Sequence, residues 1–430
     1  MTPQIKQRIE QIRRGEVPEG YKRTKAGVVP IEWEEVRIGD VLTQRKTLQC
    51  VSKDAPLLSF TIEEGVIDPA DKKSNKRDFL IKDITTKKFA LTEVGDIIYN
   101  PANLKFGAIH RNNLRRGVVS PIYGIFYGAQ NSTFMGHLLH NQRFIDYAKI
   151  YAEGTVEKLK TLSADTFKKL KITLPSLKEQ EKIAEILAAQ DKVIELQQKK
   201  IDELKRLKKV YLSKMFPKKG CNVPEIRFPG FTAPWEQRKL GDIADIVGGG
   251  TPSTGNPSYW DGDIDWYAPA EIADQIYANS SQKKITNLGY ENSSAKMLPP
   301  GTVLFTSRAG IGKTAILTRK GCTNQGFQSI VPHRGELDTY FIFSRTEELK
   351  RYGELVGAGS TFVEVSGKQM AVMELMVPPT MREQQTIGGF FQQLDNLITL
   401  HQRKCDEEKQ KKKALMQLLL TGIVRVKENE

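Results

Sequence analysis

The chain has 430 residues, of which 39% are hydrophobic, and this length favours about two to four domains with ordinary apolar cores. Its formal net charge of +14 favours polyanionic partners, nucleic acid first, although Lys-rich proteins without such partners are common. Four scattered cysteines without CxxC spacing suggest neither a zinc site nor a disulfide framework, which fits a reducing cytosol best. There is no signal segment and no apolar run of about 18 residues, so the protein is expected to be cytoplasmic.

The first 30 residues are expected to form a lead-in to the first domain. Residues 1–14 carry Ile5, Ile9 and Ile12 on one face, which predicts a short basic amphipathic helix. A string punctuated by Gly and Pro, VPEGYKRTKAGVVP, follows this helix and leads into Trp33.

Residues 31–175 are predicted to be the first globular domain. Short β-type runs, among them PLLSF, GDIIYN, GVVSPIYGIFY and KKLKITLP, alternate with turns that contain Gly, Asn and Asp. One helix is expected between them, over residues 132–151. This mixture of elements is typical of an α+β domain.

A long helix is predicted over residues 179–216, within a segment 176–220 that ends in the hinge PKKG. Its apolar and amide residues recur at steps of four and three, so they form a heptad seam that needs a partner helix to cover it. Amides in such a seam are expected to cost stability while they set the register of the helices. The seam consists of Ile183, Leu187, Gln190, Ile194, Gln197, Ile201, Leu204, Lys208, Tyr211 and Met215.

The second half of the chain repeats the first at an offset of about 200 residues. WEEVRIGDV at Trp33 corresponds to WEQRKLGDI at Trp235, and a second long helix near Glu383 matches the first. Two unrelated coiled-coil helices would also resemble each other by composition, but the flanking similarity favours a duplication. We therefore predict a second globular domain over 221–378, with a helix over 338–356. A long helix over 379–424 and a frayed tail over 424–430 are expected to follow.

No string in the chain carries a recognisable catalytic centre. SRAGIGKT, residues 307–314, has Ser where a phosphate-binding loop needs its first Gly. NPAN, residues 100–103, lacks the second proline and the aromatic residue of the amino-methyltransferase motif. The five histidines form no cluster, and the Glu-x-Lys strings at 203–205 and 348–350 lack an acidic partner at nuclease spacing. We therefore expect a protein that is not an enzyme.

DNA binding is the better-supported chemistry. Cations at turns and strand ends can reach phosphates, Arg can also read guanine edges, and Asn and Gln amides pair well with adenine. Exposed loops are normally polar, so no single residue decides, but two domains carry comparable sets. The candidates in the first domain are Lys72, Lys73, Lys76, Arg77, Lys105, Arg111, Thr155, Lys158 and Lys160. Those in the second are Thr251, Ser253, Tyr259, Trp260, Ser307, Arg308, Lys313, Asn324, Gln325, Gln328, Ser360 and Thr361.

With the repeat and both helices established, the chain resembles the specificity subunits of type I restriction-modification systems. The resemblance covers nearly the whole chain. It is carried by VPEIRFPGFTAPWEQRKLGDI, GGGTPSTGNPSYWDGDIDW, SRAGIGKTAI, TNQGF and the LP/EQ and PP/EQ segments that open the long helices. The first domain departs most from the pattern, because it lacks GGTPS and keeps only the Trp-to-Gly-Asp string, the strand at Gly95 and GTVEKLK.

The resemblance implies a complete architecture. It implies an α+β chain with two target recognition domains, each reading half of a bipartite DNA target, joined by two long antiparallel coiled-coil helices. The internal duplication would give pseudo-twofold symmetry. The implied partners are double-stranded DNA, two modification (methyltransferase) subunits and restriction (motor-nuclease) subunits. S-adenosylmethionine, ATP and magnesium would be bound by those subunits, and no cofactor or metal by this chain.

Two alternatives stay open at this point. A basic coiled-coil scaffold would bind nucleic acid without sequence preference, or bind acidic partners. A specificity subunit of a methylation-only complex would act without restriction subunits.

Overall fold

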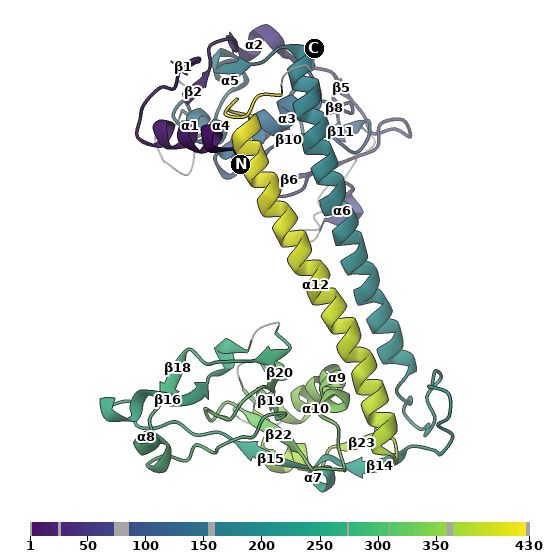
Figure 1. Cartoon of the computed structure of the whole chain (residues 1–430). Helices are drawn as coiled ribbons and strands as arrows, with labels where there is room; N and C mark the ends of the chain where they lie inside the picture. Colours follow the sequence, from purple (N-terminus) through teal and green to yellow (C-terminus); the bar gives the residue numbers. More distant parts are fainter. Residues whose placement is uncertain are drawn as a thin grey trace. The chain divides into compact units, whose positions relative to one another are not determined.

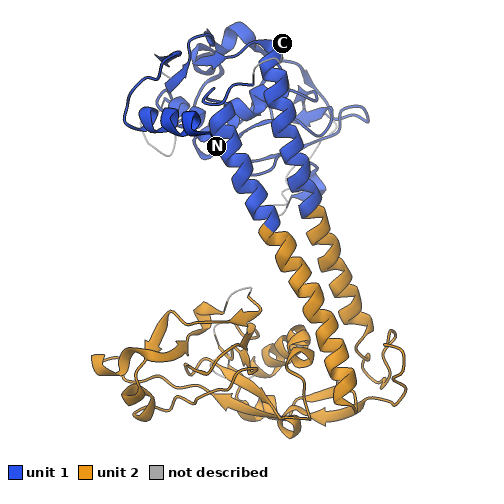
Figure 2. Ribbon diagram, viewed as in Figure 1, with its two compact units in different colours: residues 1–197, 404–430 blue, residues 198–403 orange. Residues whose placement is uncertain are grey.

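The computed structural model describes residues 2–24, 27–72, 86–153, 160–272, 275–308, 310–358 and 364–426. The chain forms two compact units: unit 1 comprises residues 1–197 and 404–430, and unit 2 comprises residues 198–403 (Figure 2). Two long helices, α6 (Leu177–Lys214) and α12 (Met381–Leu419), each contribute one part to each unit (Figure 1). Both helices lie where the heptad pattern predicts them. Among the described helices, none combines the length and apolar character needed to cross a bilayer.

The first 30 residues of unit 1 form a helix and a hairpin. The helix, α1 (Pro3–Arg13), begins at Thr2, whose hydroxyl accepts a hydrogen bond from the Ile5 amide. Two antiparallel strands follow, β1 (Tyr21–Thr24) and β2 (Gly27–Pro30). The predicted N-terminal helix is confirmed.

The C-terminal segment packs against this lead-in. The Tyr21 hydroxyl donates a hydrogen bond to the Gly422 carbonyl oxygen at 2.7 Å. Val424 and Val426 pack against the core of unit 1. The expectation of a frayed tail is therefore wrong for residues 424–426, because apolar contacts hold them, and residues 427–430 lie outside the described part of the chain.

The globular part of unit 1 contains two sheets. A four-stranded sheet has the order β10 (Ile109–Arg111), β9 (Ile97–Tyr99), β12 (Gly124–Tyr127) and β4 (Thr43–Gln44). A three-stranded sheet has the order β11 (Gly117–Val119), β8 (Phe89–Thr92) and β5 (Leu48–Gln49). Two antiparallel pairs complete the strands, β3 (Glu34–Arg37) with β13 (Lys171–Leu174) and β6 (Ser59–Thr61) with β7 (Gly65–Ile67).

The short helices of unit 1 are α2 (Ile38–Val41), α3 (Ser132–His140), α4 (Gln142–Lys149) and α5 (Ala164–Lys169). The single helix expected over 132–151 is thus two helices. The chain turns at Asn141, which leaves the helical conformation and caps α4 by accepting a hydrogen bond from the Arg143 amide.

Unit 2 contains a five-stranded sheet in the order β15 (Ala244–Gly248), β22 (Gln328–Pro332), β19 (Val303–Phe305), β20 (Thr314–Leu317) and β17 (Tyr277–Ala278). A three-stranded sheet has the order β18 (Lys283–Ile285), β16 (Trp260–Tyr267) and β21 (Gly321–Thr323). The pair β14 (Glu236–Lys239) with β23 (Glu374–Val377) precedes α12. The helices are α7 (Leu240–Ile243), α8 (Asn287–Glu291), α9 (Thr339–Ser344), α10 (Thr346–Gly357) and α11 (Gly367–Ala371).

The duplication extends to the topology of the sheets. The order β10-β9-β12-β4 in unit 1 corresponds to β20-β19-β22-β15 in unit 2, where β17 adds one more edge strand. In both units a short antiparallel pair leads into a long helix. The smaller sheets differ, because β11 pairs with β8 antiparallel whereas β21 pairs with β16 parallel. The predicted repeat is therefore confirmed in the main sheet, and the two domains diverge in the smaller one.

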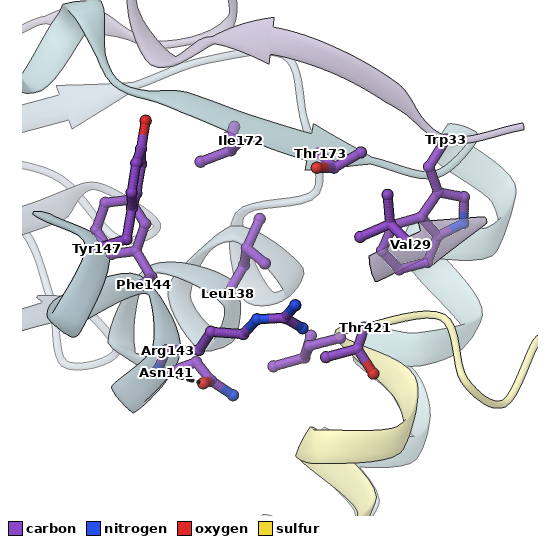
Figure 3. A pocket seen from close by; sticks show the side chains of 11 residues that line it. Val29, Trp33, Leu138, Asn141, Arg143, Phe144, Tyr147, Ile172, Thr173 and Thr421 are labelled. Atoms are coloured by element: carbon purple, nitrogen blue, oxygen red, sulfur yellow. Dashed lines mark hydrogen bonds between the residues drawn. The ribbon is translucent and has the colours of Figure 1, made fainter. Parts of the chain in front are cut away.

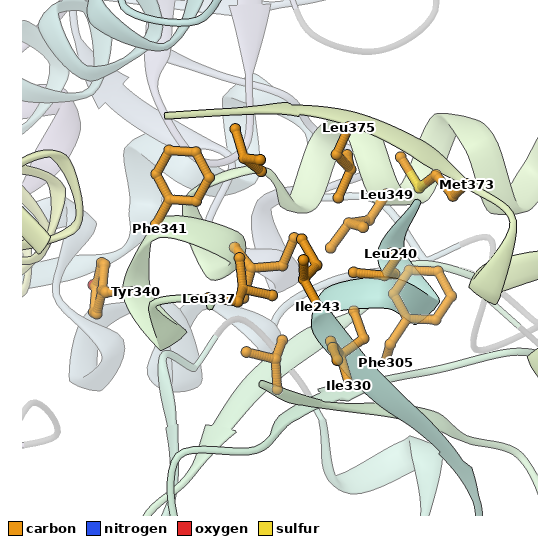
Figure 4. Close-up of a cluster of buried hydrophobic side chains, with 14 of the residues drawn as sticks. Leu240, Ile243, Phe305, Ile330, Leu337, Tyr340, Phe341, Leu349, Met373 and Leu375 are labelled. Carbon is orange, nitrogen blue, oxygen red and sulfur yellow. The ribbon is translucent and has the colours of Figure 1, made fainter. Parts of the chain in front are cut away.

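Each unit has its own core, to which part of each long helix contributes. In unit 1, Ile183 of α6 and Leu419 of α12 are buried in the same cluster. In unit 2, Leu204 of α6 and Phe391 of α12 are buried with residues of the globular domain. Figure 4 shows the globular share of this second core, which includes Leu240, Ile243, Phe305, Phe341 and Leu349.

The two cores are not equally filled at one matched place. In unit 2 the ring of Phe216, just after α6, packs 5.6 Å from that of Phe341 and 5.3 Å from the Arg345 guanidinium carbon. Leu420 is the matched residue after α12, and it lines a cavity of about 50 Å³ in unit 1 (Figure 3). The buried Thr173 hydroxyl also lines this cavity and has no hydrogen-bond partner among the described residues. Such a cavity has room for about three water molecules, which can satisfy that hydroxyl.

Candidate nucleic-acid interface

The Glu-Gln pair at the start of α6 joins this helix to the globular part of unit 1. Glu179 is 6% exposed and accepts a hydrogen bond from the Trp33 indole nitrogen at 3.3 Å. The Arg425 guanidinium, in the C-terminal segment, donates two further hydrogen bonds to the same carboxylate at 2.8 and 2.9 Å. The bonded carboxylate raises the pKa of Arg425.

Unit 2 repeats this arrangement around Glu383, at the start of α12. This carboxylate is 1% exposed and accepts a hydrogen bond from the Trp235 indole nitrogen at 3.2 Å. Arg227 donates two hydrogen bonds to it at 2.7 and 2.8 Å. We refer to these matched Trp–Glu–Arg sets as the helix clamps. Because each carboxylate is buried and paired with a partly exposed guanidinium, the clamps hold the helices rather than contact a ligand.

The Gln that follows each clamp carboxylate fixes a second helix. The Gln180 side-chain oxygen accepts a hydrogen bond from the Asn131 amide at 3.3 Å, just before α3. The Gln384 side-chain oxygen accepts one from the Asp338 amide at 3.0 Å, just before α9. The paired EQ segments are therefore structural in both units.

The glycine string of unit 2 positions a polar loop. A Cβ on Gly249 would collide with the carbonyl oxygen of Asn324, so only glycine allows this close approach. The Trp266 indole nitrogen donates to the Gly250 carbonyl oxygen at 2.8 Å. This packing brings Thr251 to Gln325, whose side-chain oxygen accepts a hydrogen bond from the threonine hydroxyl.

Three amide side chains lie beside this loop, those of Asn324, Gln325 and Gln328. The Asn324 side-chain oxygen accepts a hydrogen bond from the Gly326 amide at 2.8 Å, which holds the asparagine in its turn. Gln325 is exposed, while Asn324 and Gln328 are half-buried. Within the described residues, no hydrogen bond engages the side-chain nitrogens of Asn324 and Gln325. These donors are free to meet the acceptors of a base edge.

An aromatic group lies on the smaller sheet of unit 2. The Trp260 indole nitrogen donates to the Ser253 carbonyl oxygen at 3.2 Å, and the ring lies edge-on to Trp266 at 5.1 Å. The Lys283 ammonium lies 5.8 Å from the Trp260 ring centroid. Tyr259 is half-buried beside them. The group therefore presents a partly exposed aromatic ring on β16 and a cation on β18, the strand paired with it.

The described residues of the string SRAGIGKT, 307–308 and 310–314, lead from β19 into β20, and these two strands pair antiparallel. The Thr306 hydroxyl pins this segment, since it donates to the Gly310 carbonyl oxygen at 2.7 Å and accepts from the Lys313 amide at 3.0 Å. A phosphate-binding loop needs a helix after its Lys, whereas β20 follows here. This agrees with the expectation that the string does not hydrolyse nucleotides.

The predicted contact residues of this segment have different surroundings. Ser307 is fully buried and its hydroxyl has no partner among the described residues, so it does not face the surface that a duplex would reach. Arg308 pairs with Glu364 at 3.0 Å with its side chain about half exposed. Lys313 is exposed.

Two segments, residues 30–206 and 233–409, match the family described as type I restriction modification DNA specificity domain. The chain belongs to this family. The matched segments cover most of the chain and coincide with the two copies of the structural repeat, so the chain carries two DNA specificity domains.

Members of the specificity family from Methanocaldococcus jannaschii are similar to this chain. The type I restriction enzyme MjaIX specificity subunit is 36% identical over 167 residues, which are 38% of this chain and 38% of that protein. The putative type I restriction enzyme MjaX specificity subunit is 26% identical over 444 residues, which cover 95% of this chain and 97% of the relative. The type I restriction-modification S subunit from M. genitalium shares the fold, with a TM-score of 0.54, 14% identity, and coverage of 92% of this chain and 97% of that one.

The candidate contacts of the first specificity domain are only partly described. Lys72 is half-buried, and Lys105 lies 5.4 Å from the ring of Phe106, which is 63% exposed. Arg111 donates to the Ser132 hydroxyl at 3.0 Å and to the Asn113 side chain, and burial lowers its pKa. Lys160 is described and half-buried. The candidates Lys73, Lys76, Arg77, Thr155, Lys158, Ser360 and Thr361 lie outside the described residues.

The structure also shows residues that motif reading did not single out. Arg227 and Arg425 of the helix clamps are paired with the buried carboxylates of Glu383 and Glu179, although their positive charge counts toward the net charge of the chain. The only sequence signal was the string IR or VR after each long helix. Lys283 was also missed, because its partner Trp260 lies on another strand. Among the described candidates, hydrogen bonds thus join Thr251 with Gln325 and Ser253 with Trp260.

Proposed function

We propose that this chain is the non-catalytic, sequence-reading subunit of a type I restriction-modification complex. The globular part of each unit would read one half of a bipartite DNA target. The observation that carries the proposal is the duplication, because two matched domains repeat the same main sheet order. Two copies of one reading domain suit a target made of two half-sites. The relatives from M. jannaschii are named specificity subunits of type I restriction enzymes.

Within each domain, cations would supply affinity for DNA and amides would supply sequence specificity. Exposed cations such as Lys313, and Lys283 beside Trp260, would contact phosphates and supply most of the affinity, which would therefore fall steeply with salt. The amides of Asn324 and Gln325 would read base edges, since their nitrogens are unbonded within the described residues and glycine packing holds their loop.

The long helices would form the spacer, as an antiparallel coiled coil in a pseudo-twofold arrangement. Contacts inside unit 2 support antiparallel packing. Lys208 of α6 pairs with Asp395 of α12 at 2.6 Å, and Tyr211, one turn later, meets Phe390, one turn earlier, at 5.0 Å between ring centroids. The number of helical turns would then set the gap between the half-sites.

Catalysis would belong to partner subunits. Two modification subunits would bring S-adenosylmethionine and methylate adenine, and restriction subunits would bring ATP and magnesium, in a complex that acts on cytoplasmic DNA. Exposed apolar side chains on the helices support a duplicated protein partner. Val193 and Leu196 are 40% and 54% exposed in unit 1, and their repeat counterparts, Leu397 and Leu400, are 44% and 46% exposed in unit 2. Rows of exposed apolar residues on a helix mark a surface that another protein covers.

A genome-wide map of N6-methyladenine in the host, with and without this gene, tests the proposal. We expect methylation to disappear from a single split motif, two short half-sites around a constant gap, and to return when the gene is restored. Methylation that is unchanged by the deletion, while the partner methyltransferase is expressed, would contradict the proposal. A transformation assay with unmethylated plasmid then separates a restricting complex from a methylation-only one.

A further inference from the structure

Two aliphatic side chains stand out by their exposure. Ile150, just after α4, is 77% exposed, and Leu355, near the end of α10, is 76% exposed. No other large hydrophobic side chain of the described residues exceeds 64%. A single exposed apolar residue is ordinary and needs no explanation. Two of them at matched places in a duplicated chain do.

The places are matched by the buried residues around them. The alignment that pairs Phe144 with Leu349 and Tyr147 with Tyr352 also pairs Ile150 with Leu355. Phe144 and Leu349 are both buried in the core of their own unit. Ile150 and Leu355 therefore occupy the same position of the repeat.

The two tyrosines fix the helix ends that present these side chains. The Tyr147 hydroxyl accepts a hydrogen bond from the Lys171 amide at 3.3 Å, at the start of β13. The Tyr352 hydroxyl donates one to the Gln369 carbonyl oxygen at 2.8 Å, in α11. Each helix end is thus tied to the segment that leads into a long helix. An apolar side chain on a fixed support is a suitable anchor for a protein surface, because its ordering cost on binding is small.

The surrounding charge favours a protein over DNA. Beside Ile150, Lys149 is already paired with Asp146 at 2.9 Å. Leu355 borders a groove of about 650 Å³ in unit 2. The charged lining of this groove is mixed: Lys218, Lys219, Arg345, Arg351, Glu347, Glu348 and Glu374. A phosphate backbone would meet three carboxylates there, whereas a protein surface of mixed charge would not be repelled.

We propose that Ile150 and Leu355 are equivalent apolar anchors for two copies of one protein, each copy bound to one unit. This inference rests on the proposed function, under which that protein is the modification subunit. It adds a contact on the globular domains to the apolar rows on the helices, and it predicts that the partner carries an apolar recess that is used twice.

The test uses the full chain and the type I methyltransferase subunit of the same host, with native mass spectrometry for stoichiometry and calorimetric titration for affinity. The variants are I150S, L355S and the double variant. I122S is the matched control, because Ile122 is 64% exposed and its repeat counterpart is Gly326. All four variants should unfold at the temperature of the unsubstituted chain, since the replaced side chains lie in solvent.

We expect the unsubstituted chain to bind two copies. Each single variant should weaken one of the two binding steps about tenfold or more, the double variant both, and I122S neither. Full binding of two copies by the double variant would overturn the inference and leave the proposed function intact. Loss of DNA binding without loss of partner binding would also overturn it and assign the anchors to DNA. No methyltransferase binding by the unsubstituted chain would overturn the proposed function first, and this inference with it.

Discussion

Glu383 shows how one residue can hold a whole domain on its helix. Its carboxylate is buried in the helix clamp of unit 2 and accepts hydrogen bonds from Arg227 and Trp235. E383Q would leave the Arg227 guanidinium, whose side chain is 11% exposed, without a counter-ion. We expect unit 2 to lose about 3 kcal/mol of unfolding free energy, because removing one partner of such an ion pair leaves the other charge uncompensated. Denaturant unfolding followed by hydrogen exchange, which reports the two units separately, measures this loss.

An exposed ion pair on α6 provides the control for this substitution. Glu203 pairs with Lys200 at 3.1 Å, and both side chains are about half exposed. E203Q should change the unfolding free energy by less than about 0.5 kcal/mol. Equal losses of unfolding free energy in E383Q and E203Q would show that the helix clamp does not stabilise unit 2 more than an exposed ion pair does.

Three of the five histidines lie together in unit 1, so the expectation that they form no cluster was wrong, and burial lowers the pKa of each. His110 and His137 are both lowered to about 4, and the pKa of His140 is lowered too. The rings of His110 and His140 lie 4.3 Å apart. The charged residues that line the cavity around them are Arg111 from β10, Lys412 from α12, Glu63, Glu64, and Asp191, Lys192 and Glu195 from α6.

These histidines predict that unit 1 is acid-sensitive. A histidine that is neutral in the folded state and has a pKa of about 6.5 when unfolded takes up a proton on unfolding between these two values. Its stabilising contribution is therefore complete above about pH 6.5 and is lost as the pH falls toward 4. For His110 alone the loss by pH 4 is about 3 kcal/mol. Unfolding of H110Q and of the unsubstituted chain between pH 7 and 4 should differ in slope, and parallel pH profiles would refute the assignment.

At the scale of single residues, motif reading identified residue types but not the direction of their side chains. Ser307 was a candidate contact because it stands in a Gly-rich turn, yet its side chain is buried behind that turn. Thr251 and Gln325 were named from separate strings, and only the close approach at Gly249 shows that they meet. The sequence did not predict that Arg227 and Arg425 are clamp residues, because each binds a carboxylate at the start of a helix that is distant in sequence. Such long-range pairs leave no local pattern.

At the scale of elements, periodicity predicted the long helices well, because a seam of many turns leaves a strong pattern over nearly 40 residues. The shorter helical segments were each predicted as one helix and are two. In unit 1 the break is at Asn141, which caps α4. In unit 2 it is at Arg345, whose buried guanidinium bonds Glu348 and the Met376 carbonyl oxygen. A local cap at Asn141 and the contacts of the buried Arg345 thus override a helical pattern of a little over five turns.

The amide in the seam of α6 has a defined partner. The Gln190 side-chain nitrogen donates to the Glu408 carboxylate at 2.5 Å and to its carbonyl oxygen at 3.2 Å, both on α12 within unit 1. This hydrogen bond lowers the pKa of Glu408. Since Glu408 also pairs with Lys411 at 3.0 Å, it keeps a partner when the amide is removed.

We therefore expect Q190L to raise the unfolding free energy of unit 1 by about 0.5–1 kcal/mol while it loosens the helix register. Thermal unfolding measures the first effect. Spin labels at the exposed Glu185 and Lys413 measure the second, as a broader distance distribution. Q198L is the control, because the half-buried Gln198 makes its one side-chain hydrogen bond among the described residues to Asp202 on its own helix. A more stable Q190L variant with an unchanged distance distribution would show that the amide does not set the register.

At the scale of the whole molecule, duplication predicts that the two half-sites are read independently. The Asn324 and Gln325 amides belong to unit 2 alone, and N324A with Q325A would remove the proposed base-edge contacts without touching unit 1. Each good amide-to-base pair discriminates by about 1–3 kcal/mol. We expect the methylated motif to become degenerate in one half-site only, with the other half-site and the gap unchanged, in a methylation map of a host that carries the variant.

A variant of a cation in the same unit should affect affinity without affecting specificity. Lys313 is exposed between β19 and β20, and K313A would remove the proposed phosphate contact without changing the amides proposed to read bases. Because phosphates are the same at every sequence, the variant should weaken binding uniformly, and the dependence of log K on log salt should fall by about one unit of slope. The methylated motif should stay as it is. If K313A changed the methylated motif, cations would contribute to specificity as well as to affinity. If N324A with Q325A made both half-sites degenerate, the two units would not read separate half-sites.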